Sequence, residues 1–285
     1  MGPNNSFRAQ IPAFWAYVKI IGQAAGYTVR GRSEVSVPTL AMIKTALAKY
    51  KLDSTEIFSR DGKPTKFGTD ILRYFECRAQ MLNEFVEPRL MTAARAKKEF
   101  TQLKAKLKPK RPIPLNKQAG EKKQPAFLTG IVNMIVEANS GGVSCNYDPR
   151  ELTRFHSKER LVYALSRRVD GSFPEGSNPV AIWEIKEYYY TTTFGSRVAG
   201  GVFESILDGF ELAALKESYG IHCEHYLIVD AHYTWWECGK SYLCRLIDML
   251  HMGYCDEILF GYEVIEQLPE IVGGWVKKVK NGHKR

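Results

Sequence analysis

The stretch "AIWEIKEYYY", residues 181–190, places Glu184 and Lys186 two positions apart in a largely apolar and aromatic run. Successive side chains of a β-strand point to opposite faces, so these two charged groups share one face. Trp183 and Ile185 point to the other face. A carboxylate and an ammonium group in an apolar element cost free energy unless something pairs or uses them. The two residues are therefore either a salt bridge on an edge strand or part of a site.

Strand and helix patterns alternate on both sides of this stretch. "RLVYALSRRVD" and "PVAIWEIKEYYY" predict two strands, joined by the turn formers of "GSFPEGSN". Apolar residues at helical spacing predict a helix before them and another after them. Further strand, helix and strand patterns follow toward the C-terminus. The strands are expected at 160–170, 179–190, 223–236 and 257–265, and the helices at 126–139, 198–218 and 241–253. Strands separated by helices indicate the α/β class, with a mixed sheet flanked by helices.

Two acids fall on the neighbouring strands of this pattern. Asp170 closes the first strand and Glu184 lies near the centre of the second. If the strands form an antiparallel hairpin, the two carboxylates can converge on one cation. Mg²⁺ takes one or two carboxylates and fills its other positions with water and substrate phosphate. Lys186, on the same face as Glu184, would then lie beside a metal-bound water.

This order of residues and elements resembles the PD-(D/E)XK nuclease superfamily, whose largest branch is the type II restriction endonucleases. The resemblance covers about residues 126–265 and implies a restriction-endonuclease-like sheet. By it, Asp170 matches the first acid of the motif, Glu184 the second and Lys186 the lysine. Mg²⁺ would be held by Asp170, Glu184 and the carbonyl of Ile185. Val169 replaces the proline of the motif, which carries no ligand atom.

The superfamily often adds a glutamate from a helix next to the sheet. Glu137 is the candidate on the preceding helix, and Glu204 is the candidate on the following one. Two other [DE]-x-K triplets occur in the chain, at 61–63 in a turn pattern and at 121–123 in a basic segment. Only the triplet at 184–186 lies in an apolar predicted strand. The predicted strand before it is closed by Asp170. An edge-strand salt bridge remains the structural alternative.

Residues 104–125 form a basic segment that contains four prolines and divides the chain. It carries eight Lys or Arg residues against one acid, which accounts for most of the net charge of +9. The prolines exclude a continuous helix through 109–125. Basic side chains gain affinity for nucleic acids by releasing counterions from phosphates, so a DNA contact is one interpretation. A solvated linker is the other.

Before this segment, residues 1–103 show a helical pattern. "PTLAMIKTALAKY" predicts one helix, "DSTEIF" a short second helix and "RDGKPTKFG" a turn. A long helical pattern follows over 69–96, and Pro88 is expected to break it. This order is compatible with a helix-turn-helix that reads DNA or with a small bundle used for dimerisation.

The sequence thus predicts a cytoplasmic type II restriction endonuclease that cuts double-stranded DNA with Mg²⁺, leaves 5′-phosphates and acts as a homodimer or a higher homo-oligomer. Residues 126–285 would form the catalytic domain. Six cysteines without a CxxC pair, no secretory signal and no apolar run of membrane-spanning length favour the cytoplasm. A nuclease of repair or phage defence without strict sequence choice, and a non-catalytic DNA-binding protein, remain alternatives. The expected DNA contacts are Lys66, Arg73, Arg78, Lys106, Lys108, Lys110, Arg111, Tyr189, Thr191, Thr193 and Arg197.

Overall fold

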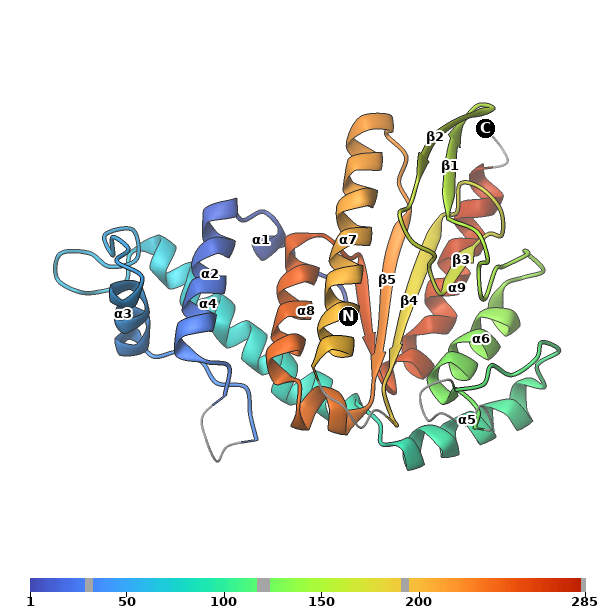
Figure 1. The fold of residues 1–285 in the computed structure, drawn as a ribbon, viewed down its shortest axis with the longest axis horizontal. Coiled ribbons are helices and arrows are strands. Elements are labelled where there is room, and N and C mark those ends of the chain that lie inside the picture. The colour runs from blue at the N-terminus through green and yellow to red at the C-terminus, as the bar shows by residue number, and fades with distance from the viewer. Residues whose placement is uncertain (29–32, 117–123, 191–194, 283–285) are drawn as a thin grey trace.

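A mixed sheet lies at the centre of the C-terminal two-thirds of the chain in the computed structural model (Figure 1), which describes residues 1–28, 33–116, 124–190 and 195–282. Within these residues the sheet has four strands in the order β3-β4-β5-β6. They are β3 (Gly171–Phe173), β4 (Ala181–Glu187), β5 (Glu224–Asp230) and β6 (Glu257–Phe260). The β3 strand pairs antiparallel with β4, while β4, β5 and β6 run parallel. The predicted α/β class and mixed sheet are confirmed.

Helices cover both faces of the sheet. On one face lie α6 (Phe127–Asn139) and α9 (Glu263–Gly282), with α5 (Ala93–Leu107) packed on α6. On the other face lie α7 (Ser196–Tyr219) and α8 (Lys240–Met252). Trp183 of β4 stacks on Trp275 of α9 with ring centroids 5.5 Å apart. The strands are buried on both sides, which explains their nearly continuous apolar sequences.

The strand that pairs antiparallel with β4 is not the predicted one. The strand expected over 160–170 ends early and forms a separate antiparallel hairpin, β1 (Arg154–Ser157) with β2 (Arg160–Ala164). Three residues of the expected loop 171–178 form β3 instead. A Cβ atom on Gly171 would lie 2.0 Å from the Trp183 ring, so only glycine lets β3 approach β4 here. Asp170 therefore precedes its strand and does not close one.

The N-terminal residues form a small helical bundle of α1 (Asn5–Arg8), α2 (Pro12–Ala25), α3 (Leu40–Lys49) and α4 (Lys66–Gln80). The short helix expected over 53–58 is absent from these described residues, because the Asp53 side chain accepts the Thr55 backbone N–H and forms a turn. The connection between α3 and α4 spans residues 50–65. A helix-turn-helix joins its helices by roughly three or four residues. The geometry that motivated the helix-turn-helix interpretation is therefore missing.

The pattern over 69–96 divides into two helices, as Pro88 suggested. After α4 the chain forms a π-helical turn (Met81–Val86) and a short 3-10 helix (Glu87–Arg89), and α5 begins after the Thr92 cap. The α5 helix runs to Leu107, so Lys104 and Lys106 are helical and the extended part of the basic segment begins beyond them. Lys117, Lys122 and Lys123 lie outside the described residues. No helix of the described chain is long and apolar enough to cross a membrane.

Candidate active site

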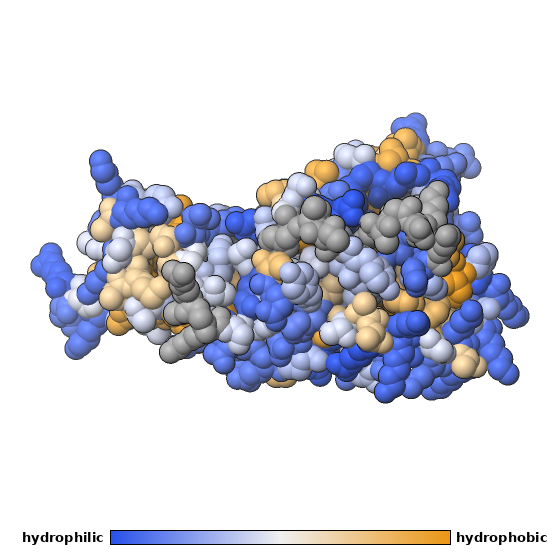
Figure 2. All heavy atoms as spheres, turned by 60° about the horizontal axis from the view of Figure 1, so that its bottom comes forward, coloured by the Kyte–Doolittle hydropathy of each residue, from blue (hydrophilic) through white to orange (hydrophobic). Residues whose placement is uncertain are grey.

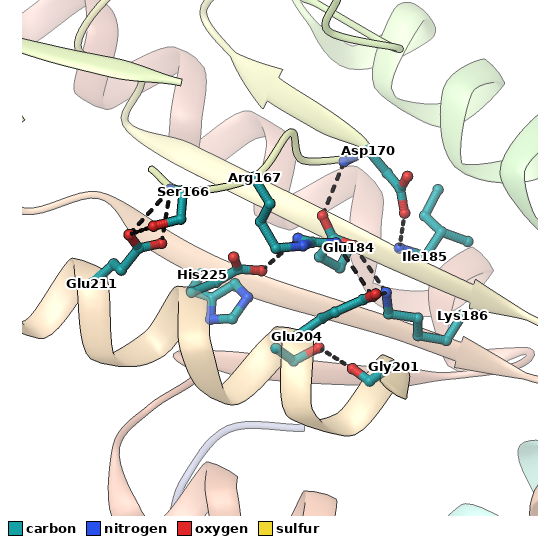
Figure 3. Close-up of polar contacts among 12 residues, drawn as sticks. Ser166, Arg167, Asp170, Glu184, Ile185, Lys186, Gly201, Glu204, Glu211 and His225 are labelled. Carbon is teal, nitrogen blue, oxygen red and sulfur yellow. Dashed lines mark hydrogen bonds and ion pairs between the residues drawn. The ribbon is translucent and has the colours of Figure 1, made fainter. Parts of the chain in front are cut away.

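Asp170 lies at the edge of β4, one residue before β3 begins. Its backbone N–H donates to the Trp183 carbonyl at 3.2 Å and to Oε1 of Glu184 at 3.1 Å. Its Oδ2 atom accepts the backbone N–H of Ile185 at 2.7 Å (Figure 3). The Asp170 side chain thus continues the hydrogen bonding of β4 where β3 has not yet begun. This contact joins the predicted first acid to the Glu184-x-Lys186 triplet.

Glu184 is fully buried in a network of charged side chains on the α7 face of β4. Its Oε2 atom accepts from Nη2 of Arg167 at 2.7 Å and from Nζ of Lys186 at 3.0 Å. Burial opposes ionisation, but the hydrogen bond from Arg167 and the charge of Lys186 outweigh it, so the pKa of Glu184 is lowered. Glu184 is therefore a paired carboxylate inside the protein.

Lys186 is held between two carboxylates. Its Nζ atom donates to Glu184 and to Oε2 of Glu204 at 2.8 Å, and the residue is only 7% exposed. Burial alone would lower the pKa of Lys186, but the charges of Glu184 and Glu204 raise it above its ordinary value. Lys186 therefore stays an ammonium group, which can donate hydrogen bonds but cannot take a proton from water.

Arg167 and Asp208 complete the network and were not predicted from the sequence. Nη1 of Arg167 donates to Oδ2 of the buried Asp208 at 2.8 Å, and Nη2 approaches Glu204 at 3.5 Å. Burial raises the pKa of Asp208 to about 7, against the opposing charge of Arg167. Glu204 and Asp208 are four residues apart on α7 and so share one helix face. The spacing of these two acids on one helix face, beside small residues such as Gly201, is the sequence signal that could have identified Asp208.

Asp170 faces a different environment from Glu184. It lines a cavity of about 760 Å³ together with Ile185 and Glu187, which point to the α6 face of β4. Asp170 is exposed to solvent there, but surrounding protein atoms still disfavour its ionised form. Burial and the charge of Glu184 raise the pKa of Asp170 to about 6, against the opposing Ile185 N–H. The Glu187 carboxylate accepts from the backbone N–H and the hydroxyl of Thr129, at the N-terminus of α6.

Two oxygen donors beside Asp170 are of the kind that a magnesium ion takes. Oδ1 of Asp170 has no hydrogen-bond partner within the described part of the chain. The N–H and C=O of one strand residue point to the same edge, so the Ile185 carbonyl lies on the Asp170 side of β4. A carboxylate and a carbonyl oxygen are ligands that Mg²⁺ takes along with water. Glu184 could add only Oε1, because its Oε2 atom already accepts from Arg167 and Lys186. No group of three or more His, Cys, Asp or Glu residues suited to a metal occurs among the described residues.

The two candidates for the additional glutamate lie in different places. Glu204 contacts Lys186 directly, as the following helix α7 passes over β4. Glu137 lies on α6, and its Oε1 atom accepts the backbone N–H of Lys110 at 3.2 Å. The structure thus brings Glu204 to the triplet, whereas Glu137 contacts the basic segment.

Seven of the residues expected to bind DNA are exposed, one is buried and one is half-buried. Arg78 is buried and pairs with Asp248 at 2.9 Å, so it holds α4 to α8 and cannot reach DNA. Tyr189 is half-buried, and its hydroxyl is already engaged because it donates to the buried Asp230. Thr191 and Thr193 lie outside the described residues. The exposed residues are Lys66, Arg73, Lys106, Lys108, Lys110, Arg111 and Arg197.

Comparison with known protein families identifies the family of the part of the chain that contains this site. Residues 91–275 match a family model described as a domain of unknown function, DUF7687. The chain belongs to this family. The DUF7687 region begins just before α5 and includes Arg167, Asp170 and the 184–186 triplet. Residues 1–85 match a second model, also described as a domain of unknown function, DUF7690.

No curated protein and no solved structure matches the chain. The two family matches meet between residues 85 and 91, within the turns that separate α4 from α5. The α5 helix packs on α6, and Phe100 lies against Gly130. Helix α5 therefore belongs with the DUF7687 region in both sequence and packing, although it was expected in the N-terminal domain.

Proposed function

We propose that the chain is a Mg²⁺-dependent endonuclease that cuts double-stranded DNA and leaves 5′-phosphates, with a PD-(D/E)XK site of the type II restriction kind. The observation that carries this proposal is the contact of Asp170 with the Glu184-x-Lys186 triplet at the open edge of β4. The element order supports it as well, because an antiparallel strand pair lies between α6 and α7 and a parallel strand follows.

Each residue has a distinct part in the proposed reaction. Asp170 and the Ile185 carbonyl would hold Mg²⁺, with Oε1 of Glu184 completing the set. Bound there, the metal supplies a Lewis acid that stabilises charge on the scissile phosphate. Lys186, kept protonated by Glu184 and Glu204, would orient the attacking water and donate to the phosphate. It would not be the base that deprotonates the water.

A basic surface leads to this site. The exposed side of α5 carries Lys97, Lys98, Lys104 and Lys106, and the chain continues through Lys108 and Lys110 to Arg111 at the cavity. Figure 2 shows the face that carries α5, and hydrophilic side chains cover much of it. Such a row can follow the phosphates of a duplex without reading its sequence. Two copies of the site could cut both strands in one binding event, so the proposal includes a homodimer.

The same chemistry without strict sequence choice is a second candidate, as in a nuclease of repair or phage defence. It is favoured by the N-terminal bundle, where the described residues lack the short turn of a helix-turn-helix and Arg78 is buried. Sites cut in plasmid DNA separate the two, because a restriction enzyme gives discrete fragments and a less selective nuclease gives a smear.

The decisive test compares the unmodified protein with Asp170→Ala on plasmid and phage DNA, with and without Mg²⁺. Metal-dependent nicking by the unmodified protein alone, with 5′-phosphate ends, is the expected result. Metal-independent binding without any cutting would instead identify a non-catalytic DNA-binding protein.

A further inference from the structure

We propose that the cavity beside Asp170 binds a single nucleotide of the substrate strand that has left the base stack. This inference rests on the proposed nuclease function and adds to it the form of DNA that reaches the site. The cavity of about 760 Å³ lies within the range of about 300–1,000 Å³ typical of small-ligand pockets. It is therefore large enough for more than a metal ion and its waters.

The position of Asp170 in the cavity wall suits such a nucleotide. Asp170 and Ile185 form part of the cavity wall, next to residues of α6 and of the loop at 146–150. A phosphate bound at Asp170 would lie at the wall of this cavity, and the sugar and base attached to it would then have the space of the cavity beside them. A paired base inside a duplex cannot enter this space, because its partner and its stacked neighbours hold it in place.

The outer part of the cavity offers a stacking surface with positive charge. The Arg111 guanidinium lies over the Tyr147 ring, 4.2 Å from its centroid, and both residues line the cavity. Arg150 lines it as well and is exposed. Arginine and tyrosine side chains stack on unpaired bases, and the two cations can contact the flanking phosphates.

The inner part of the cavity offers hydrogen-bonding groups that suit the edge of a base. Asn133 of α6 lines it, and its Oδ1 atom is buried without a hydrogen-bond partner among the described residues. Buried acceptors rarely lack a partner in native proteins, so an ordered water satisfies this atom, or a ligand donor does where the side chain turns toward the cavity. An exocyclic amino group or a ring N–H of a base supplies one. Asn146 adds a second amide to the lining.

The test uses duplexes with 2-aminopurine next to the scissile phosphate, in Ca²⁺ to prevent cutting. The fluorescence of this base rises when it leaves the stack. The unmodified protein should raise it, and Asn133→Leu should abolish the rise and slow cleavage in Mg²⁺ at least tenfold. Asn139→Leu, on the same helix but outside the cavity lining, should behave like the unmodified protein. Arg111→Ala, at an exposed position, should reduce the signal without any change in folding.

The outcomes separate this inference from the proposed function. Titration with free deoxynucleoside monophosphates distinguishes a site for free nucleotides from one for a substrate nucleotide. Binding of free nucleotides without a fluorescence change would overturn the inference, as would normal cleavage and fluorescence in Asn133→Leu. An unmodified protein that cuts DNA with no fluorescence rise at any position near the cut would refute the inference alone. A protein that never cuts DNA would refute the nuclease proposal first, and this inference with it.

Discussion

The backbone N–H of Asp170 donates to Oε1 of Glu184 at 3.1 Å, while the Asp170 carboxylate accepts the backbone N–H of Ile185. The two acids are therefore adjacent, but they face different surroundings. Glu184 belongs to a buried ionic network under α7, and Asp170 opens into the cavity next to α6. This separation leaves Asp170 exposed to ligands, while Glu184 holds Lys186 through Oε2 and has only Oε1 left to offer a metal.

Lys186→Ala should abolish cleavage and leave DNA binding within about twofold, because Asp170 and the Ile185 carbonyl remain in place. Glu184 keeps Arg167 as a partner, so we expect the free energy of unfolding to fall by only about 1–3 kcal/mol. Cleavage assays, gel-shift titration in Ca²⁺ and denaturant unfolding measure the three quantities. Cleavage by Lys186→Ala at the rate of the unmodified protein would show that Lys186 is not required for catalysis.

Arg167→Met should destabilise the fold more than any other single change in the network. It leaves the buried Glu184 and Asp208 without the guanidinium that both contact, and removal of one partner from a buried ion pair costs about 3–5 kcal/mol. Arg168→Met is the matched control, because Arg168 is the exposed neighbour and its loss should change stability little. Equal unfolding midpoints for the two variants would show that the network contributes nothing to stability.

Gly201→Ala should impair catalysis without altering any charge. A Cβ atom at this position would lie 2.9 Å from the Tyr188 hydroxyl and 3.1 Å from Cδ of Lys186, so the lysine must move. We expect cleavage to fall at least tenfold. Gly200→Ala is the control, since nothing lies within 4 Å of its Cβ atom and alanine in a helix adds roughly 0.5–1 kcal/mol of stability. Equal cleavage rates in the two variants would contradict the close packing of Lys186.

Asp170→Asn should remove a pH dependence of stability. The pKa of Asp170 rises from 3.8 to about 6 on folding, so the folded state binds its proton more tightly than the unfolded chain. Stability contributed by this proton is complete below pH 4 and is lost as the pH rises through 6. In metal-free buffer the variant should therefore match the unmodified protein near pH 4 and exceed it above pH 6.

The same Asp170→Asn comparison tests the metal ligand. Mg²⁺ should raise the melting temperature of the unmodified protein above pH 6, where Asp170 is ionised, and leave the variant unchanged. An equal shift in both proteins would place the metal elsewhere.

Neutralising the basic surface should weaken binding to all DNA sequences alike. Each lost phosphate contact lowers the slope of log affinity against log salt by about 0.9. The residues to replace by Gln together are Lys106, Lys108, Lys110 and Arg111. A matched set of exposed lysines on the N-terminal part, which should change little, is Lys44, Lys49, Lys51 and Lys63. Equal salt slopes in both variants would mean that the basic segment only connects the two parts.

The sequence by itself determined the α/β class, the helices α6, α7 and α8, and the proximity of Asp170 to the 184–186 triplet. The class and the helices depend on local order, namely the helical spacing of apolar residues and the alternation along β4. The proximity of Asp170 was predicted from a pairing of strands 160–170 and 179–190 that does not form, so the contact exists for a different reason. The class and the helices can be inferred from sequence patterns because one face of each element must be apolar to be buried.

The tertiary structure decided which groups meet those faces. Periodicity could not show that Arg167 joins Glu184 to Asp208 and Glu204, or that Arg78 turns inward to Asp248. Nor could it show that β3, within a stretch of turn formers, pairs with β4 because Gly171 leaves room for Trp183. The cavity is built from five separate segments. The pattern of apolar residues in the sequence predicts that a side chain is covered. The identity of the partner that covers it depends on the packing of distant parts of the chain.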